Sequence, residues 1–326
     1  MFRKIMVPLD GSPFAEVSLP CAEEIACRMN SQIILLSVLE QITARYENLL
    51  KCYLENCSNT LKQRIADNGG RCVSVEPLLV KQAGETDQIG DGLLGMAIGH
   101  PAVDIINTAV SQKASLIIMA THGYSGFQQF TMSNVADTIV RRCGLPVLLV
   151  RPSGQANASI CRNILVPLDG SSLAERAVTV VEEMAEKMVG QEMKVNLVHI
   201  VQEGHRSSSP EPSATFLTFV SHPAWHATGH GDELYFTKVR EYLGILGQKL
   251  SSNGVSVSTT VCSGKPEVEI GRMVDENNTG LVVMSSHSRT GIAKYVIGSV
   301  ADRVLRTVDA SLLLLRPDKS QLVDAE

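Results

Sequence analysis

The sequence predicts an α/β protein built from two doubly wound, parallel-sheet domains in tandem. The stretch from Leu116 to Arg141 recurs in altered form from Leu281 to Arg306. Short apolar runs alternate with segments of helical spacing in both halves, which is typical of βαβ units. A length of 326 residues also suits two domains better than one. We expect domains at 1–152 and 160–317, joined by a short polar linker.

Each half opens with a buried strand that ends in the same turn sequence. Residues 4–12 read KIMVPLDGS, and residues 163–171 read NILVPLDGS. The segment that follows in the second half has apolar residues at helical spacing from Leu173 to Met188, which predicts a helix with one buried face. Its counterpart in the first half contains Pro20, which we expect to kink or shorten the helix.

The later elements repeat in the same order. Near-continuous apolar runs at 33–38 and 195–200 are typical of parallel strands covered on both faces. The last helix opens at Ser133-Asn134 in one half and at Gly298-Ser299 in the other, and the last strands are the runs VLLV and LLLL. Because a bare apolar edge strand invites aggregation, we expect these two strands to pair across a pseudo-two-fold.

Composition and charge argue against several classes of protein. With 44% hydrophobic and 19% charged residues the chain can bury a sizeable core, and no apolar run approaches the ~18 residues of a membrane span. A net charge of −5 without a Lys/Arg cluster at either end argues against nucleic acid as a partner. The N-terminus enters a strand directly, which predicts a cytoplasmic location. The eight cysteines include no CxxC pair, so we expect no metal site.

Three parts of each half should meet at the carboxyl ends of the strands, where ligands bind in this architecture. A turn aspartate can accept from ribose hydroxyls, backbone beside the second strand can read an adenine edge, and amides at a helix N-terminus can hold phosphates. In the second half the residues are Pro167, Leu168, Asp169, Ile200, Met284, Ser285, His287, Ser288, Gly298, Ser299 and Val300. In the first half they are Pro8, Asp10, Val38, Met119, Ala120, Gly123, Ser133 and Asn134.

Simpler interpretations of these residues stay open. The DGS sequence would also suit Asp169 as a turn or capping carboxylate. Ser299 with Asp302 fits a capping box that needs no ligand, and Asn134 with Asp137 fits it almost as well.

Two loop histidines, His122 and His287, occupy equivalent places in the two halves. No nucleophile with an orienting third residue accompanies either of them, so we interpret them as loop-packing or phosphate-neighbouring residues and expect no catalytic residue.

Two insertions distinguish the halves, at 82–98 and at 203–232, and both should be loops at the rim of the sheet. The first contains GDGLLG, a chance match to GxGxxG because no strand directly precedes it. The second leaves from the second strand and is expected to overhang the site as a lid. Its histidines are interrupted by proline and glycine, which favours a polar flap over a zinc site. They are His205, His222, His226 and His230.

Taken together, these motifs resemble the universal stress protein family, as two such domains in one chain. The resemblance covers nearly the whole chain and rests on VPLDGS, MATHGYSG, SSHSRTG, GSVADRVLR, VLLVRP and LLLLRP. It implies a Rossmann-like, adenine nucleotide alpha hydrolase-like fold in each half and ATP as ligand, with or without Mg²⁺. It also implies an intrachain pseudo-dimer of the two domains, or a homodimer.

The ATP-binding members of that family carry Gly-x-x-Gly, nine residues, then Gly followed by Ser or Thr. The first half keeps one glycine of the three, and the second keeps only the terminal pair. The positions that correspond are Ala120, Gly123, Ser133 and Asn134, and Ser285, Ser288, Gly298 and Ser299. We therefore expect nucleotide binding to favour the second half.

Two classes of function remain open. The first is a nucleotide-binding stress-response or signalling module with little or no hydrolysis, because the sequence shows neither a GxxxxGK[ST] motif nor an evident general base. The second is a stress protein that binds no nucleotide and acts through protein–protein interaction.

Overall fold

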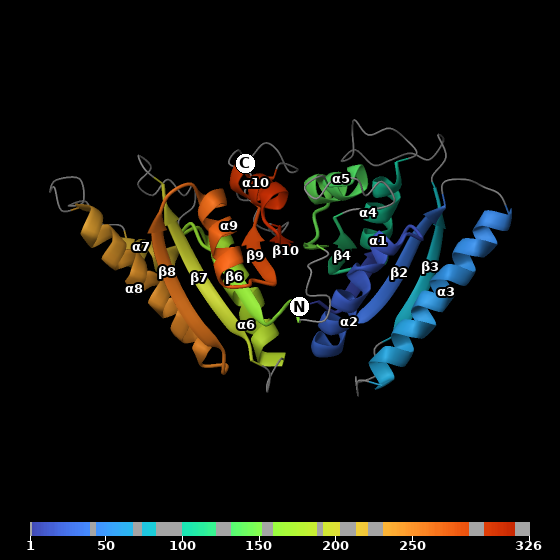
Figure 1. Cartoon of the computed structure of the whole chain (residues 1–326), viewed down its shortest axis with the longest axis horizontal. Helices are drawn as coiled ribbons and strands as arrows, with labels where there is room; N and C mark the ends of the chain where they lie inside the picture. The colour runs from blue at the N-terminus through green and yellow to red at the C-terminus, as the bar shows by residue number, and fades with distance from the viewer. Residues whose placement is uncertain are drawn as a thin grey trace. The chain divides into compact units, whose positions relative to one another are not determined.

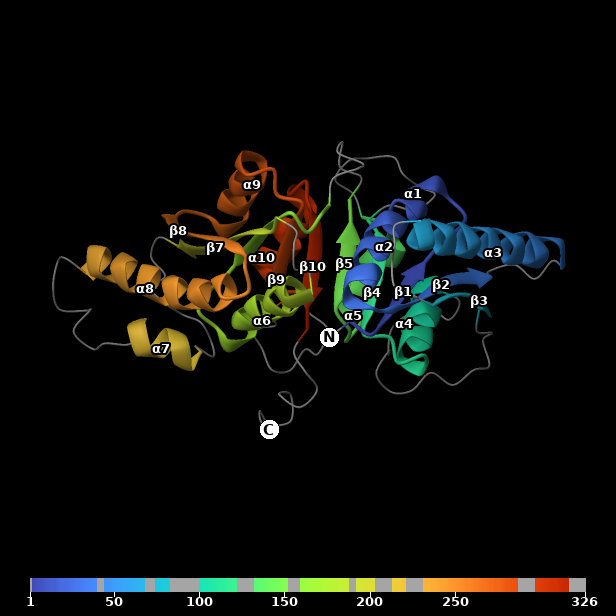
Figure 2. The ribbon, with the colours of Figure 1, turned by 90° about the horizontal axis from the view of Figure 1, so that it is seen from below.

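The structure is a computed structural model that describes residues 2–39, 44–67, 74–82, 100–121, 132–151, 159–187, 192–202, 213–220, 231–286 and 297–316. The chain divides into two compact units, one in each half. Each is a sheet with helices on both sides (Figures 1 and 2). Within each unit, every strand pair described here is parallel. The predicted doubly wound α/β fold is confirmed.

The first unit has the strand order β3-β2-β1-β4-β5. Its elements are β1 (Lys4–Pro8), α1 (Pro13–Glu16), α2 (Ser18–Met29), β2 (Gln32–Leu39), α3 (Ala44–Asp67), β3 (Val75–Lys81), α4 (Pro101–Ser111), β4 (Leu116–Ala120), α5 (Asn134–Arg142) and β5 (Val147–Val150).

The second unit has the same order of equivalent strands, β8-β7-β6-β9-β10, and its inserted segment contains a helix, α7. Its elements are β6 (Asn163–Pro167), α6 (Ser172–Lys187), β7 (Lys194–Val201), α7 (Ala214–Val220), α8 (Gly231–Ser251), β8 (Ser256–Ser263), α9 (Pro266–Glu276), β9 (Leu281–Ser285), α10 (Ser299–Thr307) and β10 (Ser311–Leu315).

The apolar runs form the buried centre of each sheet. The side chains of Ile5, Met6 and Val7 on β1 are fully buried, as are Leu281 and Val282 on β9. Helices cover both faces: Figure 2 shows α2 and α3 on one side of the first sheet and α4 on the other. In the second unit α6, α7 and α8 lie on one side and α9 on the other. Two-sided cover explains why these strands are apolar throughout rather than alternating.

Pro20 interrupts the first helix of the first unit, as predicted. A proline ring clashes with the carbonyl four residues earlier, which here belongs to Glu16. The helix ends at that residue, and α2 begins at Ser18. In the second unit, α6 runs unbroken over the equivalent stretch.

The insertion at 203–232 differs from the prediction. The sequence predicts a loop there, but residues 214–220 form α7 and the last two residues belong to α8. Ser213 caps α7, because its Oγ accepts a hydrogen bond from the N–H of Phe216 at 2.9 Å. Residues 203–212 and 221–230, with their four histidines, lie outside the described residues, as does the GDGLLG segment.

Candidate functional site

The strands of each unit part at one point of the sheet. β1 and β4 are paired only at Ile5↔Leu116 and Met6↔Ile117, although β1 continues to Pro8 and β4 to Ala120. The strands that follow β1 in the chain, β2 and β3, lie on one side of it, and the later strands β4 and β5 lie on the other side. In open α/β sheets such a switch point is where ligands bind, outside the carboxyl ends of the strands.

The second unit repeats this geometry. β6 and β9 are paired at Ile164↔Leu281 and Leu165↔Val282, while β6 runs on to Pro167 and β9 to Ser285. The chain therefore has two equivalent candidate sites, each built from the ends of three strands and the start of a helix.

The predicted residues of the strands lie where expected. Pro8 and Pro167 end the first strands, and Val38 and Ile200 lie one residue before the ends of β2 and β7. Met119 with Ala120 and Met284 with Ser285 close β4 and β9. Gly123, His287 and Ser288, like His122, lie outside the described residues.

The turn after the first strand is almost identical in the two units. Asp169 Oδ1 accepts hydrogen bonds from the N–H (3.0 Å) and the hydroxyl (2.6 Å) of Ser171. Ser171 in turn caps α6 by accepting from the N–H of Ala174 at 3.1 Å. The intervening Gly170 has φ +83°, in the left-handed region. The turn interpretation of the aspartate is thus correct, and its exposed side chain still faces solvent beside the strand ends.

Asp10 repeats the arrangement in the first unit. Its Oδ1 lies 2.9 Å from the Ser12 nitrogen and 2.6 Å from the Ser12 hydroxyl, and Ser12 caps α1 through the N–H of Ala15 at 3.2 Å. Gly11 has φ +82°. The shared DGS sequence therefore encodes one turn geometry in both units.

The last helices begin one residue earlier than the capping-box interpretation requires, so that interpretation is wrong. Gly298 is the N-cap of α10 and Ser299 its first helical residue, so Ser299 does not cap the helix. Asp302 binds Arg306 instead, at 3.2 Å. Asn134 is likewise the first helical residue of α5, whose N-cap is Ser133.

Of the two last helices, α5 has a capping side chain and α10 does not. The Oγ of Ser133 accepts from the N–H of Ala136 at 3.2 Å, and the Ser133 N–H donates to the carbonyl of Thr121 (2.9 Å), directly after β4. This second bond holds the helix N-terminus at the carboxyl end of the sheet. The N-cap Gly298 of α10 supplies no side-chain hydrogen bond.

Ser285 joins two parts of the second site. Its hydroxyl donates to the carbonyl of Leu173 in the first turn of α6 at 2.5 Å. The hydroxyl therefore links the end of β9 to the helix that follows the aspartate turn. At the equivalent position, Ala120 offers no hydroxyl to the first unit.

An aromatic cluster beside the second site was missed by the sequence reasoning. The ring of His199 on β7 stacks on Phe216 of α7, with centroids 5.9 Å apart, and its Nε2 lies 3.4 Å from the Tyr235 hydroxyl. Phe216 also meets Tyr242 edge to face at 5.1 Å. The apolar FLTF run within a polar insertion, and a histidine inside a buried strand, were the signals available.

Burial governs the titration of this cluster. Desolvation lowers the pKa of His199 to about 4, although the nearby charge of Asp169 acts in the opposite direction. Burial also raises the pKa of Tyr235 to about 12, and it raises the pKa of Tyr242, where the charge of Glu175 adds to the effect. All three side chains are therefore neutral at pH 7.

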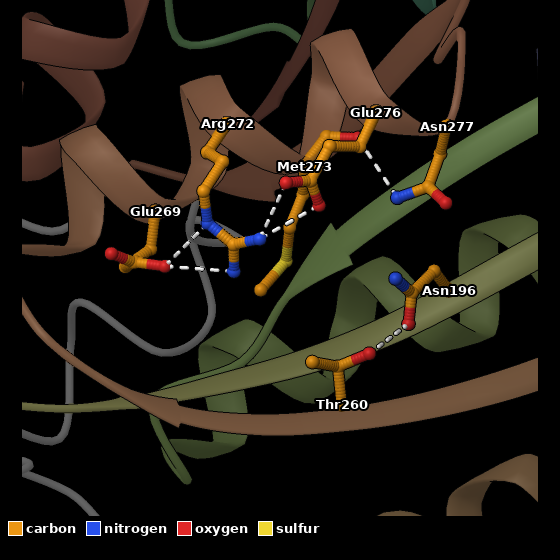
Figure 3. Close-up of polar contacts among 7 residues, drawn as sticks. All are labelled: Asn196, Thr260, Glu269, Arg272, Met273, Glu276 and Asn277. Atoms are coloured by element: carbon orange, nitrogen blue, oxygen red, sulfur yellow. Dashed lines mark hydrogen bonds and ion pairs between the residues drawn. The ribbon is translucent and has the colours of Figure 1, made fainter.

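Two groups of polar contacts lie on the second unit, one on α9 and one on the neighbouring strands β7 and β8. On α9, Arg272 pairs with Glu269 at 3.0 Å and with Glu276 at 2.7 Å (Figure 3). On the strands below it, Thr260 donates to Asn196 at 3.1 Å. Ion pairs of this kind within one exposed helix contribute at most a few tenths of a kcal/mol each.

The described residues contain no group of three or more His, Cys, Asp and Glu side chains placed to hold a metal ion. Within the same residues, every helix is too short or too polar to span a bilayer.

The fold and the paired switch points define a protein of two doubly wound α/β domains in one chain. The model of the universal stress protein family matches residues 1–151 and 161–316. The chain belongs to that family, with one family domain in each half.

Individual relatives agree with this assignment. Universal stress protein MJ0577 of Methanocaldococcus jannaschii is 22% identical over 161 residues, which are 46% of this chain and 96% of that protein. Universal stress protein E of Escherichia coli K12 is 25% identical over 227 residues, 68% of this chain and 67% of that protein. The crystal structure of a universal stress protein from Archaeoglobus fulgidus covers 96% of this chain and 98% of its own, with a TM-score of 0.63 and 17% identity.

Proposed function

We propose that the chain binds an adenine nucleotide, ATP with or without Mg²⁺, at the switch point of its second half and more weakly at that of its first. The observation that carries the proposal is the early end of the β6–β9 ladder, followed in the chain by a helix whose N-cap is a glycine. A right-handed βαβ crossover brings the N-terminus of α10 to the carboxyl edge of the sheet. A phosphate there would meet amide N–H groups and the positive end of the helix dipole.

The difference between the two helix N-termini supports the asymmetry. In α5 the Ser133 hydroxyl already binds the N–H of Ala136, so a phosphate would compete with a cap. In α10 the bare backbone of Gly298 allows close approach and Ser299 adds a hydroxyl at the first helical position. The exposed Asp169 carboxylate suits ribose hydroxyls, and the backbone beside Ile200 suits an adenine edge.

Within the second site, the groups described here favour binding over catalysis. The Oδ1 of Asp169 already accepts two hydrogen bonds from Ser171, and His199 is buried and neutral. Neither is arranged to take a proton from a water that attacks a phosphate. We propose a stress-response or signalling module that hydrolyses ATP slowly or not at all, in the cytoplasm.

Recovery of bound nucleotide tests the proposal most directly. Protein purified without added nucleotide should release an adenine nucleotide on acid precipitation, identified by mass spectrometry, and calorimetry on the stripped protein should show ATP binding. If no nucleotide is released and ATP gives no heat at millimolar concentration, the proposal is wrong. The remaining candidate is then a protein that acts through protein–protein interaction.

A further inference from the structure

The two units hold the same turn in place by different means. In the first unit, the Ser37 hydroxyl donates to the carbonyl of Leu9 at 2.6 Å. Ser37 follows Leu36, the β2 partner of Pro8. The corresponding residue of the second unit is His199, one after the β7 partner of Pro167. Its imidazole also interacts with the backbone of Leu168, the equivalent of Leu9, although Nδ1 has no partner at ordinary hydrogen-bond geometry among the described residues.

In the second unit, the inserted segment adds further contacts to the turn. The N–H of Ser213 donates to the carbonyl of Gly170, in the middle of the aspartate turn, at 2.9 Å. The hydroxyl of the same serine donates to the carboxylate of Glu175 in the first turn of α6. Ser213 therefore ties α7 both to the turn that carries Asp169 and to the helix that the turn begins.

Phe216 packs against the turn that carries Asp169. It is 2% exposed and packs between His199 and Tyr242, on the side of the sheet where Figure 2 shows α7 beside α8. A Cβ at Gly170 would lie 2.6 Å from the Phe216 ring, so the turn backbone rests directly on it. At Gly11 the same Cβ would meet nothing within 4 Å.

We propose that Ser213 and Phe216 are positioning residues for Asp169, so that the inserted segment sets the nucleotide affinity of the second half without affecting the first. The inference rests on the proposed nucleotide site, since Asp169 is its ribose-binding group. The turn backbone between Leu168 and Ser171 fixes where that carboxylate points. A partner that draws α7 away from Gly170 would weaken one site and leave the other unchanged.

Calorimetric titration of ATP into full-length variants tests the coupling. Phe216→Ala should weaken binding at the second half about 10-fold, and Ser213→Ala should weaken it less, because alanine keeps the N–H bond to Gly170 and loses the hydroxyl contact to Glu175. Leu217→Ala is the matched control, because this residue is on the same helix and is 43% exposed; it should leave binding unchanged. In an Asp169→Ala background, Phe216→Ala should cost no further affinity. An additive loss in that double variant would overturn the proposal.

Amide hydrogen exchange supplies a readout that needs no nucleotide. The Ala174 N–H is protected by Ser171, and the Ala15 N–H by Ser12 in the first unit. Phe216→Ala and Ser213→Ala should speed exchange at Ala174 and leave Ala15 unchanged. If the wild-type protein binds no ATP, the proposed function fails but this comparison still decides the positioning role. Unchanged exchange at Ala174 in both variants would refute it.

Discussion

At the scale of single residues, the two turn glycines form a natural matched pair. Gly11 and Gly170 share the same left-handed backbone conformation, with φ of +82° and +83°. They differ in their surroundings, because only Gly170 rests on an aromatic ring. Replacing each by alanine therefore separates backbone strain from steric conflict.

Gly11→Ala should lower the free energy of unfolding by about 1 kcal/mol, the cost of placing an L-residue in the left-handed region. Gly170→Ala should cost roughly 1–3 kcal/mol more, because the Phe216 ring must move to admit the methyl group. Urea denaturation followed by circular dichroism measures both. Equal losses would mean that the turn does not rest on Phe216.

His199 should make stability depend on pH. Its pKa is about 4 in the folded protein and near 6.5 when unfolded, so between these values the unfolded chain binds more protons. The free energy of unfolding should therefore fall by ~3 kcal/mol as the pH is lowered from about 6.5 to about 4. Above pH 6.5 the histidine is neutral in both states and this loss of stability is absent.

The control is His199→Ser, which copies Ser37 of the first unit and removes the titrating group. Of the groups that face His199, Tyr235 and Tyr242 stay neutral over this range, and the charge of Asp169 reduces the effect without reversing it. The difference between the two proteins in urea midpoint, followed from pH 7.5 to pH 4, isolates the histidine. If the urea midpoints of the two proteins change with pH in parallel, His199 is not the group responsible.

At the scale of elements, α5 and α10 occupy equivalent places but begin differently. Ser133 caps α5 through its side chain, whereas Gly298 caps α10 with backbone alone. Stability and ligand binding should therefore respond in opposite ways to mutation of the two serines near these N-termini.

Ser133→Ala should cost about 1 kcal/mol of unfolding free energy, the usual value of an N-cap, and Ser299→Ala close to nothing. For ATP binding the order should reverse: Ser299→Ala should weaken it on the order of 10- to 100-fold, and Asn134→Ala far less. Thermal denaturation and calorimetric titration of the three variants give both readouts. The proposed preference of ATP for the second half would be wrong if Asn134→Ala abolished ATP binding and Ser299→Ala left it intact.

The sequence predicted the parallel strands, the helix break at Pro20 and the strand-end location of the candidate residues, because these depend on local apolar pattern and chain order. It did not predict α7. The position of Phe216 depends on a space formed by β7, α8 and the turn, which are distant in sequence. The N-caps were misplaced by one residue, because a Gly-Ser or Ser-Asn pair allows either residue to adopt the extended cap conformation.

At the scale of the whole molecule, each unit repeats one architecture, and each ends in a short apolar strand. β5 and β10 are the last strands of their units, paired to β4 and β9 respectively. Such a strand is hazardous as a free edge in an isolated domain. That the two halves pair through these strands stays a prediction.

Residues 1–152 expressed alone should therefore form a dimer or an insoluble product, because the edge of VLLV opposite β4 would have no partner strand within the fragment. Sedimentation velocity of the soluble fraction measures the state. A well-behaved monomer of the unsubstituted fragment would count against pairing through β5.

Because the inserted helix α7 contacts the aspartate turn of the second unit, the effect of deleting it should depend on the residue at position 199. Removal of residues 203–232 should lower the thermal midpoint sharply while His199 is present, because the aspartate turn then loses Ser213 and Phe216. The same deletion made together with His199→Ser should be better tolerated, since the new hydroxyl can reach the Leu168 carbonyl as Ser37 reaches Leu9. Equal midpoints for the two deletions would disprove this dependence. The cost of losing the inserted helix is thus set in part by the side chain at position 199.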